Sequence, residues 1–303
     1  MKVIDAHVHL VQCIAGTGAA GEMRYCGEGC GRYADGSVVQ LIPPALGDSQ
    51  VTPEAVIALM DEYEVESAVL LQGNYIGFQN LYSYEAWQKY PDRFLAAAAY
   101  DPFSRDRDKI VRHLFEDLQI PVVKFEVSTG SGLMANHETL PLDGVLMEKE
   151  YAYADEHGLV FVIDIGKLGS ASSQISALRR AILRHPSMRF VVCHLLAPKQ
   201  GMEVQLWEGL EALKLPNVWF DLASLQNNLR PDPSPFPYTR SVIRHAADLL
   251  GADRLLFGSD LPTTLTRFSY RDIIDCIAQA PQFSLSEKQA ILYDNARQVF
   301  WEH

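Results

Sequence analysis

The chain has 303 residues, 48% of them hydrophobic, and a formal net charge of −12 at pH 7. This length and apolar content allow one large core, in either two modest domains or one α/β barrel. Because the net charge is negative and no basic stretch is interleaved with aromatic residues, we expect no nucleic-acid partner. The sequence also lacks the run of about 18 apolar residues that a membrane span requires.

Cysteine usage and the start of the chain favour a reducing compartment. Five cysteines are few and irregularly spaced for a disulfide framework in a chain of this size. The first residues show no charged stretch followed by an apolar one, which is the pattern typical of a secretory signal. We therefore expect a soluble cytoplasmic protein that binds neither membranes nor nucleic acid.

Runs rich in β-branched and aromatic residues alternate with amphipathic helical stretches along the whole chain. Eight such βα units are typical of a (β/α)₈ TIM barrel, and no Pro/Gly/Ser-rich linker divides them. We therefore predict a single α/β barrel domain over residues 1–303. The expected strands are 2–8, 66–72, 93–100, 121–127, 158–164, 188–194, 217–223 and 254–260.

Residues 11–51 do not fit this repeat. They follow the first strand and form a Gly-rich segment that contains Cys26 and Cys30. A loop this long is typically functional or disordered, and since it follows the C-terminal end of a strand we expect it over the barrel mouth. The spacing of the two cysteines occurs in zinc sites, but two further ligands are lacking, so a structural role is favoured. Two more insertions, 127–144 and 226–239, follow the fourth and seventh strands.

Three of the nine histidines lie where a barrel places its chemistry, at the C-terminal ends of strands. Alternation along the first strand places His7 and His9, together with Asp5, on one face. Two imidazoles roughly 6.5–7 Å apart at Cα can bind one ion, although satisfied core histidines are the alternative. His194 ends the sixth strand. The others are expected to be solvated or helix-capping: His113, His137, His157, His185, His245 and His303.

Charged residues end three further strands. Asp260 follows the eighth strand, which neighbours the first strand once the barrel closes, so its carboxylate can reach an ion held by the two histidines. Lys124 and Glu126 share a face of the fourth strand, and we expect that face to point inward because charged side chains rarely face the helix layer. Asp164 ends the fifth strand. For Glu126 and Asp164, a turn or helix-cap role is an equal alternative.

With these motifs the chain resembles the amidohydrolase superfamily, specifically its amidohydrolase-related (amidohydrolase-2) branch. The resemblance covers most of the chain and rests on DAHVHL at 5–10, VVCHLLAP at 191–198, LLFGSDLP at 255–262 and the closing helix 286–300. It implies a barrel that binds a divalent metal through His7, His9 and Asp260, with His194 acting on the substrate. Zn²⁺ is the expected ion, and Mn²⁺ is the alternative.

The chain departs from the family pattern at the fifth strand. Members with one metal commonly have a histidine where this chain has Asp164. Since other relatives place a carboxylate or a carboxylated lysine on the fourth strand, Glu126, Asp164 or Lys124 would complete the ligand set. Relatives that resemble pyrone-dicarboxylate lactonase also lack the histidine and work without metal. A metal-independent lactonase therefore remains an alternative.

The resemblance implies an enzyme that hydrolyses an amide, a lactone or a related carbonyl compound. A metal-bound water of lowered pKa would provide the hydroxide that attacks the carbonyl carbon. Asp260 would transfer the proton to the leaving group, and His194 would stabilise the developing negative charge. One rival is a lyase of the same branch, either a non-oxidative decarboxylase or a hydratase. The other is a binding protein without catalysis on the same scaffold.

Cations near strand ends predict a small carboxylated molecule as the substrate. A solvated loop charge is the alternative for each of them. The sequence leaves the oligomeric state open; barrels of this branch often form dimers, and a homodimer is one alternative. The candidate substrate-binding residues are Lys124, Lys167, Arg230 and Arg267.

Overall fold

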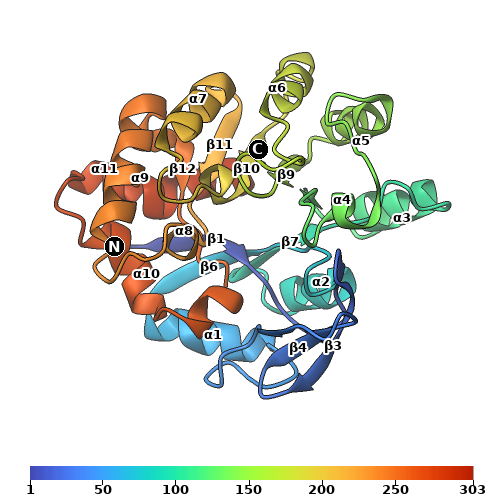
Figure 1. Ribbon diagram of the computed structural model, residues 1–303, viewed down its shortest axis with the longest axis horizontal. Helices are drawn as coiled ribbons and strands as arrows, with labels where there is room; N and C mark the ends of the chain where they lie inside the picture. The colour runs from blue at the N-terminus through green and yellow to red at the C-terminus, as the bar shows by residue number, and fades with distance from the viewer. Residues whose placement is uncertain (303) are drawn as a thin grey trace.

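All eight predicted strands are present, and they pair in parallel in the order in which the chain supplies them. In the computed structural model, which describes residues 1–302, they form the inner ring of a barrel with helices outside (Figure 1). The predicted TIM-barrel fold is therefore confirmed. The strands are β1 (Val3–Val8), β6 (Val65–Leu70), β7 (Phe94–Ala98), β8 (Val122–Glu126), β9 (Val160–Asp164), β10 (Phe190–Val192), β11 (Val218–Asp221) and β12 (Leu255–Leu256).

The first and last strands meet through backbone hydrogen bonds beyond the end of β12. The N–H of Asp260 donates to the carbonyl oxygen of His7, and the N–H of His9 donates to that of Leu261, both at 2.9 Å. These bonds hold two segments side by side that are about 250 residues apart in the sequence. Closure of the barrel therefore brings the two strand-one histidines next to Asp260.

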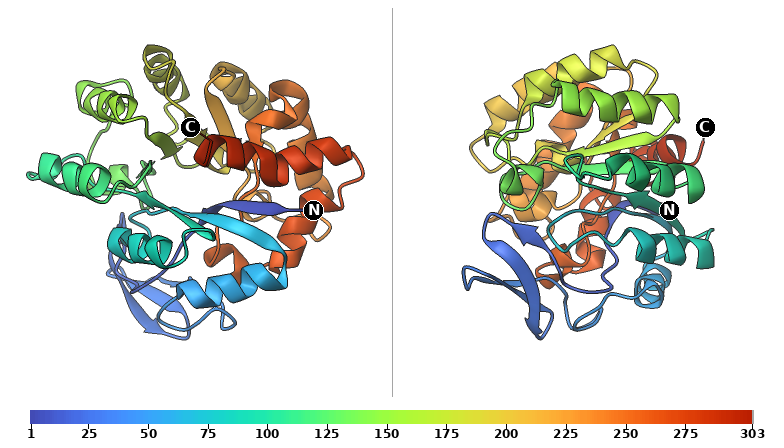
Figure 2. Two further views of the ribbon diagram at one scale, coloured as in Figure 1. Left: turned by 180° about the vertical axis from the view of Figure 1, so that it is seen from behind. Right: turned by 90° about the vertical axis from the view of Figure 1, so that its right-hand side faces the viewer.

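Helices cover the outside of the barrel, and the last of them closes one end. Seen from behind, α12 lies across the end of the barrel at which β1 begins (Figure 2). Among residues 1–302, no helix is both long and apolar enough to cross a lipid bilayer. The outer helices are α1 (Pro53–Glu62), α2 (Asn80–Lys89), α3 (Arg107–Arg112), α5 (Val145–Glu156), α6 (Ile175–Arg184), α7 (Glu203–Leu213), α9 (Pro237–Leu250), α10 (Tyr270–Ala278), α11 (Leu285–Gln289) and α12 (Asn295–Phe300).

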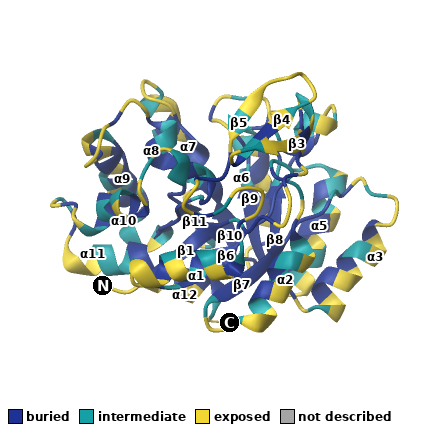
Figure 3. Cartoon of the chain, turned by 90° about the horizontal axis from the view of Figure 1, so that it is seen from below, coloured by how far each residue is buried: buried dark blue, intermediate teal, exposed yellow. Residues whose placement is uncertain are grey.

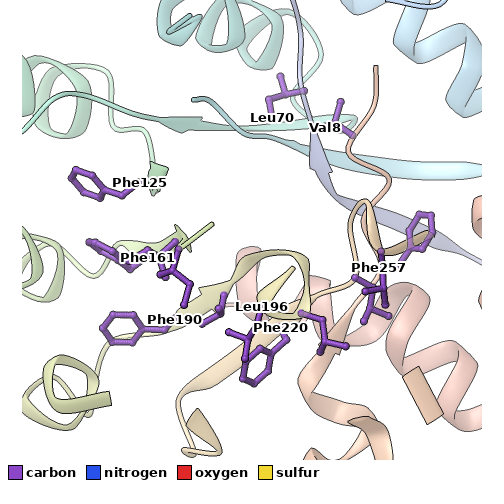
Figure 4. Packing of buried hydrophobic residues seen from close by; sticks show 14 of the residues in the cluster. Val8, Leu70, Phe125, Phe161, Phe190, Leu196, Phe220 and Phe257 are labelled. Atoms are coloured by element: carbon purple, nitrogen blue, oxygen red, sulfur yellow. The ribbon is translucent and has the colours of Figure 1, made fainter. Parts of the chain in front are cut away.

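Alternating residues of the strands build two separate apolar layers. Val160 and Val162 of β9 belong to the cluster inside the ring. Phe161, between them, belongs to the larger cluster that includes the helices. Its ring lies 5.4 Å from that of Phe125 and 5.6 Å from that of Phe190, measured between centroids (Figure 4). Packing on both faces explains why these strands are almost continuously apolar up to their polar C-terminal ends.

The segment 11–51 contains a small antiparallel sheet. Its strands are β2 (Thr17–Gly18), β3 (Gly21–Gly27), β4 (Cys30–Tyr33) and β5 (Val38–Gln40). The sheet lies at the end of the barrel opposite the two termini (Figure 3). The N–H of Thr17 donates to the carbonyl oxygen of Asn74, and that of Ala19 donates to Gly130, both at 2.9 Å. The sheet therefore packs on the loops that follow β6 and β8.

Cys26 and Cys30 flank the turn between β3 and β4. Both are free thiols. The Sγ of Cys26 lies 3.5 Å from the carbonyl oxygen of Cys30, and the Sγ of Cys30 lies 3.0 Å from Oε1 of Gln40. Within residues 1–302, neither thiol belongs to a group of three side chains that could hold a metal ion.

The strict alternation predicted for β1 breaks down near its end. The pairing of β1 with β6 shifts register between Asp5 and Val8. Oδ2 of Asp5 accepts a hydrogen bond from the hydroxyl of Tyr270 on the outer helix α10 at 2.8 Å. The ring of His7, by contrast, lies 4.8 Å from that of His194. The prediction that Asp5 shares a face with the histidines is therefore wrong, because an irregularity in the ladder redirects the side chains that follow it.

Candidate active site

His7, His9 and Asp260 converge where β1 and β12 end. Nε2 of His9 lies 3.2 Å from Oδ1 of Asp260, and Nε2 of His7 lies 3.6 Å from the same oxygen. One ligand atom from each residue lies within 4.8 Å of the others. Two imidazole nitrogens and one carboxylate oxygen at this separation can surround a single divalent ion.

The outer ring nitrogen of each strand-one histidine has a fixed acceptor. Nδ1 of His7 lies 3.0 Å from Oδ2 of Asp221, and Nδ1 of His9 lies 3.0 Å from the carbonyl oxygen of Leu71. Since both oxygens accept, each Nδ1 carries the hydrogen of the neutral ring and leaves Nε2 as a lone-pair donor. Nε2 of His7 is buried and has no hydrogen-bond partner among residues 1–302. Such an orphaned nitrogen fits a metal ligand.

The protonation states agree with this assignment. Burial lowers the pKa of His7 to about 4, even though Asp221 opposes the shift. Burial alone would raise the pKa of Asp221, but the neighbouring His7 lowers it to about 2. For Asp260, burial is likewise outweighed by His9 and the neighbouring imidazoles, and its pKa falls below its usual range. At neutral pH the site therefore presents a neutral His7 and ionised carboxylates, as metal binding requires.

His194 faces this cluster with a different charge. Its Nδ1 lies 2.8 Å from the carbonyl oxygen of Ala223, and its Nε2 lies 3.6 Å from Oδ2 of Asp164. Burial opposes the charged form, but the interactions with Asp164 raise the pKa of His194 to about 10. His194 is therefore a cation at neutral pH and can stabilise negative charge or donate a proton.

An unusual backbone turn carries His194. The four residues from His194 to Ala197 have φ angles of 60°, 48°, 67° and 46°, although none of them is glycine. Left-handed backbone costs a residue with a Cβ roughly 1–2 kcal/mol. The N–H of His194 donates to Oδ1 of Asp221 at 2.8 Å, and the N–H of Ala197 donates to the carbonyl oxygen of His194 at 2.8 Å. The surrounding contacts thus hold a strained turn that sets the position of the ring.

This strain predicts an unusual response to glycine. We expect Ala197→Gly to raise the free energy of unfolding by up to about 1 kcal/mol, because the strain relieved exceeds the added entropy of the unfolded chain. Ala152 is exposed in α5, and Ala152→Gly should lower the free energy of unfolding by roughly 0.5–1 kcal/mol. Urea unfolding of both variants measures the difference, and equal losses would show that the turn is unstrained.

Glu126 and Asp164 line the same cavity but have partners of their own. The carboxylate of Glu126 accepts from the hydroxyls of Ser128 and Ser131 at 3.2 and 2.8 Å. Oδ1 of Asp164 accepts a backbone N–H at 2.7 Å. The structure therefore places both carboxylates beside the histidine cluster. Among residues 1–302, the groups close enough to share an ion are His7–His9–Asp260 and His7–His194–Asp221.

The four predicted substrate-binding cations occupy different positions. Lys124 lines a cavity of about 190 Å³ together with the site histidines, and Lys167 lines an adjoining cavity of about 320 Å³. Arg230 and Arg267 belong to neither lining, and both donate to Asn227, each at 2.9 Å. Two of the four cations are therefore available to a ligand at the histidine cluster.

Lys124 remains charged although it is buried. Burial would lower its pKa, but interactions with Cys193 and with the carboxylates of Glu126 and Asp164 raise it above the ordinary value. The two cavities share part of their lining and form one mouth. The shared residues are Glu126, Ser131, Asp164, His194 and Asp260.

The small antiparallel sheet reaches the mouth through Tyr33 of β4. This tyrosine is half-buried, and burial together with the charge of Glu126 raises its pKa to about 12. Tyr75 lines the first cavity, and burial with the neighbouring Tyr33 and Asp260 raises its pKa further. Both phenols therefore keep their hydrogens, and Tyr75, which lines the cavity, can donate to a ligand.

Sequence reasoning missed Asp221. It ends β11, is completely buried, and contacts both the ring of His7 and the backbone of His194. The available signal was an aspartate at the C-terminal end of an otherwise apolar barrel strand, Val-Trp-Phe-Asp, the same pattern that singled out Asp164. In a TIM barrel, a polar residue at the C-terminal end of a strand typically belongs to the active site.

The histidines that we expected to lie away from the site do not line its cavities. Nε2 of His137 lies 2.8 Å from Oδ2 of Asp101, and the ring of His245 stacks on Trp207 with the centroids 4.0 Å apart. His303 lies outside the described residues.

Comparison with solved structures shows the same fold in several proteins. A probable 2-pyrone-4,6-dicarboxylic acid hydrolase from Acinetobacter baumannii with bound citric acid aligns with a TM-score of 0.72, 18% identity and 99% of each chain covered. An amidohydrolase from Burkholderia multivorans with bound zinc aligns at 0.70, with 16% identity and 99% of each chain covered. A 2,6-dihydroxybenzoate decarboxylase from Rhizobium aligns at 0.59, with 16% identity, over 81% of this chain and 87% of its own.

Comparison with family models is more specific. No curated protein matches the chain. The model of the amidohydrolase-2 family, described as amidohydrolase, matches residues 4–300. The match covers His7 in β1 and His9 just after it, and extends past Asp260 into α12. The protein is therefore a member of the amidohydrolase-2 family within the amidohydrolase superfamily.

Proposed function

We propose that the protein is a metal-dependent hydrolase of a small carboxylated amide, lactone or related carbonyl compound. The observation that carries this proposal is the convergence of His7, His9 and Asp260. In the neutral state of His9, its Nε2 lone pair faces a carboxylate oxygen 3.2 Å away. Two such acceptors repel each other unless a cation lies between them.

The donor set fits Zn²⁺, with Mn²⁺ as the alternative. Imidazole and carboxylate ligands suit zinc, and the amidohydrolase from Burkholderia multivorans holds that ion. When bound, the ion would supply a Lewis acid that polarises a carbonyl oxygen and lowers the pKa of water. Carboxylates outnumber cations around the cavity, so a divalent ion would also offset their charge. The charged groups lining it are Glu126, Asp164, Asp260, Lys124 and His194.

Asp260 and His194 supply the remaining chemistry. Asp260 is ionised at neutral pH, so its Oδ atoms can accept a proton from the attacking water and return it to the leaving group. The protonated ring of His194 can donate a hydrogen bond to the oxygen on which negative charge develops. Asp164 holds that ring in its charged form through a contact of 3.6 Å.

The second cavity would bind the polar end of the substrate. Lys167 supplies positive charge there, and hydroxyl and amide groups supply hydrogen bonds. A carboxylated substrate agrees with the citric acid bound to the similar hydrolase from Acinetobacter baumannii. The polar lining residues are Ser128, Thr129, Ser131, Ser170, Ser224 and Asn228.

A lyase is the second candidate, favoured by one observation. His194 is a partly buried acid beside a carboxylate, and a decarboxylase or hydratase needs such a group to deliver a proton to carbon or oxygen. The similar structures include a decarboxylase of 2,6-dihydroxybenzoate. A lactonase that works without metal is a third candidate, because Asp164 stands where one-metal relatives have histidine.

A substrate panel separates these reactions. Dicarboxylic lactones, amides and aromatic acids would be incubated with the metal-loaded protein, while acid release and CO₂ are followed together. We expect acid release without CO₂. Release of CO₂ would identify a lyase instead, and no turnover across the panel would favour a binding protein.

Replacement of Lys167 tests the carboxylate site. Lys167→Met should raise KM for a carboxylated substrate by about tenfold or more, with a smaller change in kcat, because a charged hydrogen bond contributes about 1.5–3 kcal/mol. Lys214→Met is the matched control, since Lys214 is exposed at the end of α7 and belongs to neither cavity. Equal KM values for the two variants would place the substrate carboxylate elsewhere.

A further inference from the structure

We propose that Asp221 is a positioning residue that fixes the metal-binding tautomer of His7 and anchors the backbone that carries His194. The inference rests on the proposed metal site. Asp221 contacts two histidines that lie far apart in the sequence, one in β1 and the other in the turn after β10.

Each oxygen of Asp221 has a defined set of donors. Oδ1 accepts the backbone N–H of His194 at 2.8 Å and that of Ala223 at 3.1 Å. Oδ2 lies 3.0 Å from Nδ1 of His7. The side chain is fully buried, so these protein groups replace the water that would otherwise solvate the carboxylate.

The carboxylate determines which ring nitrogen of His7 carries the hydrogen. An ionised carboxylate can only accept, so a hydrogen bond from Nδ1 requires that Nδ1 is protonated. Nε2 then keeps its lone pair, and this is the buried nitrogen that has no partner within residues 1–302. The other tautomer would leave Oδ2 facing a second lone pair and would place a hydrogen where the metal binds.

Asparagine at this position cannot reproduce the pattern. Two backbone N–H groups meet one oxygen of Asp221, so the single amide oxygen would stay with them. The amide NH₂ would then donate to Nδ1 of His7 and move the ring hydrogen to Nε2. The flipped amide would instead direct NH₂ at the two backbone donors and lose both of those buried hydrogen bonds. Each orientation weakens either His7 as a ligand or the turn at His194.

Asp5 provides a matched comparison. It is also fully buried and also has three hydrogen-bond donors: the backbone N–H of His7 at 3.1 Å, that of Ser259 at 2.9 Å and the hydroxyl of Tyr270 at 2.8 Å. A tyrosine hydroxyl can accept as well as donate. Asparagine at position 5 therefore keeps all three bonds, with its oxygen on the backbone groups and its NH₂ on Tyr270. Asp221 and Asp5 therefore differ in one respect: the tautomer of the His7 ring depends on the carboxylate of Asp221 and not on that of Asp5.

Metal affinity of the apoprotein is the first test. Co²⁺ would be titrated into wild type, Asp221→Asn and Asp5→Asn, and binding followed by visible absorption. We expect Asp221→Asn to weaken Co²⁺ binding by about 10- to 100-fold and to change the ligand-field spectrum. Asp5→Asn should stay within about threefold of wild type. Thermal unfolding of each variant checks that it is folded.

The Co²⁺ titration distinguishes failure of the role of Asp221 from failure of the proposed metal site. Equal Co²⁺ affinity in folded Asp221→Asn and wild type would overturn the role of Asp221. Absence of Co²⁺ binding by wild type would instead contradict the proposed metal site, and the tautomer of His7 would still be measurable.

The tautomer is the second test, and it requires no variant at Asp221. Long-range ¹H–¹⁵N correlation spectra of the ¹⁵N-histidine-labelled apoprotein distinguish the two ring forms, and His7→Gln assigns the signal. We expect wild-type His7 to carry its hydrogen on Nδ1. A signal from the Nε2–H form would overturn the proposal, and a change to that form in Asp221→Asn would support it directly.

Discussion

Asp260→Asn is expected to lower kcat/KM by about a thousandfold or more while leaving the fold intact. An amide cannot accept a proton from water, and it is a weaker partner than a carboxylate for a cation. We propose both tasks for Asp260, whose Oδ1 lies 3.2 Å from Nε2 of His9 and 3.6 Å from that of His7. The measurement is steady-state kinetics on the substrate that the panel identifies.

Metal content and thermal unfolding serve as controls for this variant. The backbone of Asp260 donates to the carbonyl oxygen of His7, and an asparagine keeps that bond. The melting temperature should therefore change little. If Asp260→Asn is folded and retains activity near that of wild type, Asp260 has no part in the mechanism.

Removal of metal is expected to abolish turnover. Protein purified without chelators should contain about one equivalent of a divalent transition metal, as expected for a site with two histidines and one carboxylate. Dialysis against a chelator should reduce turnover to background, and Zn²⁺ or Mn²⁺ should restore it. Elemental analysis and activity would be measured on the same samples.

Histidine variants control for damage by the chelator. His9→Gln should reduce bound metal and turnover together, because it removes one of the two converging imidazole nitrogens. His245→Gln should change neither, since His245 stacks on Trp207 away from the mouth. Full turnover by metal-free protein would favour the lactonase that works without metal.

Most of the fold could be predicted from local patterns in the sequence. Strands such as 160–164 are apolar on both faces because one face packs inside the ring and the other against helices. Eight such runs alternating with helical stretches permit few arrangements other than a (β/α)₈ barrel. The order of the strands also predicts that His7, His9 and Asp260 lie close together, since these residues end the first and last strands and the two strands must be neighbours in a closed barrel.

The prediction failed where side-chain direction depends on irregular backbone. Asp5 was expected on the face of the histidines, but its carboxylate accepts a hydrogen bond from Tyr270, and the register shift after Asp5 redirects the side chains that follow. The residues after β1 contain a four-stranded sheet. This Gly-rich segment shows no alternation of apolar and polar residues that would have predicted its strands. Arg230 and Arg267 follow strand ends as Lys167 does, and both donate to Asn227 outside the two cavities; their role in substrate binding stays a prediction.

The sequence by itself therefore determined the barrel, its family and the strand ends at which the candidate site lies, because these depend on periodicity and chain order. Only the tertiary structure decided which polar groups meet. The contact between Asp221 and His7 joins strands 214 positions apart, and the charge of His194 depends on burial and on Asp164. Distances, shared acceptors and desolvation arise from packing in three dimensions, and no spacing along one strand encodes them.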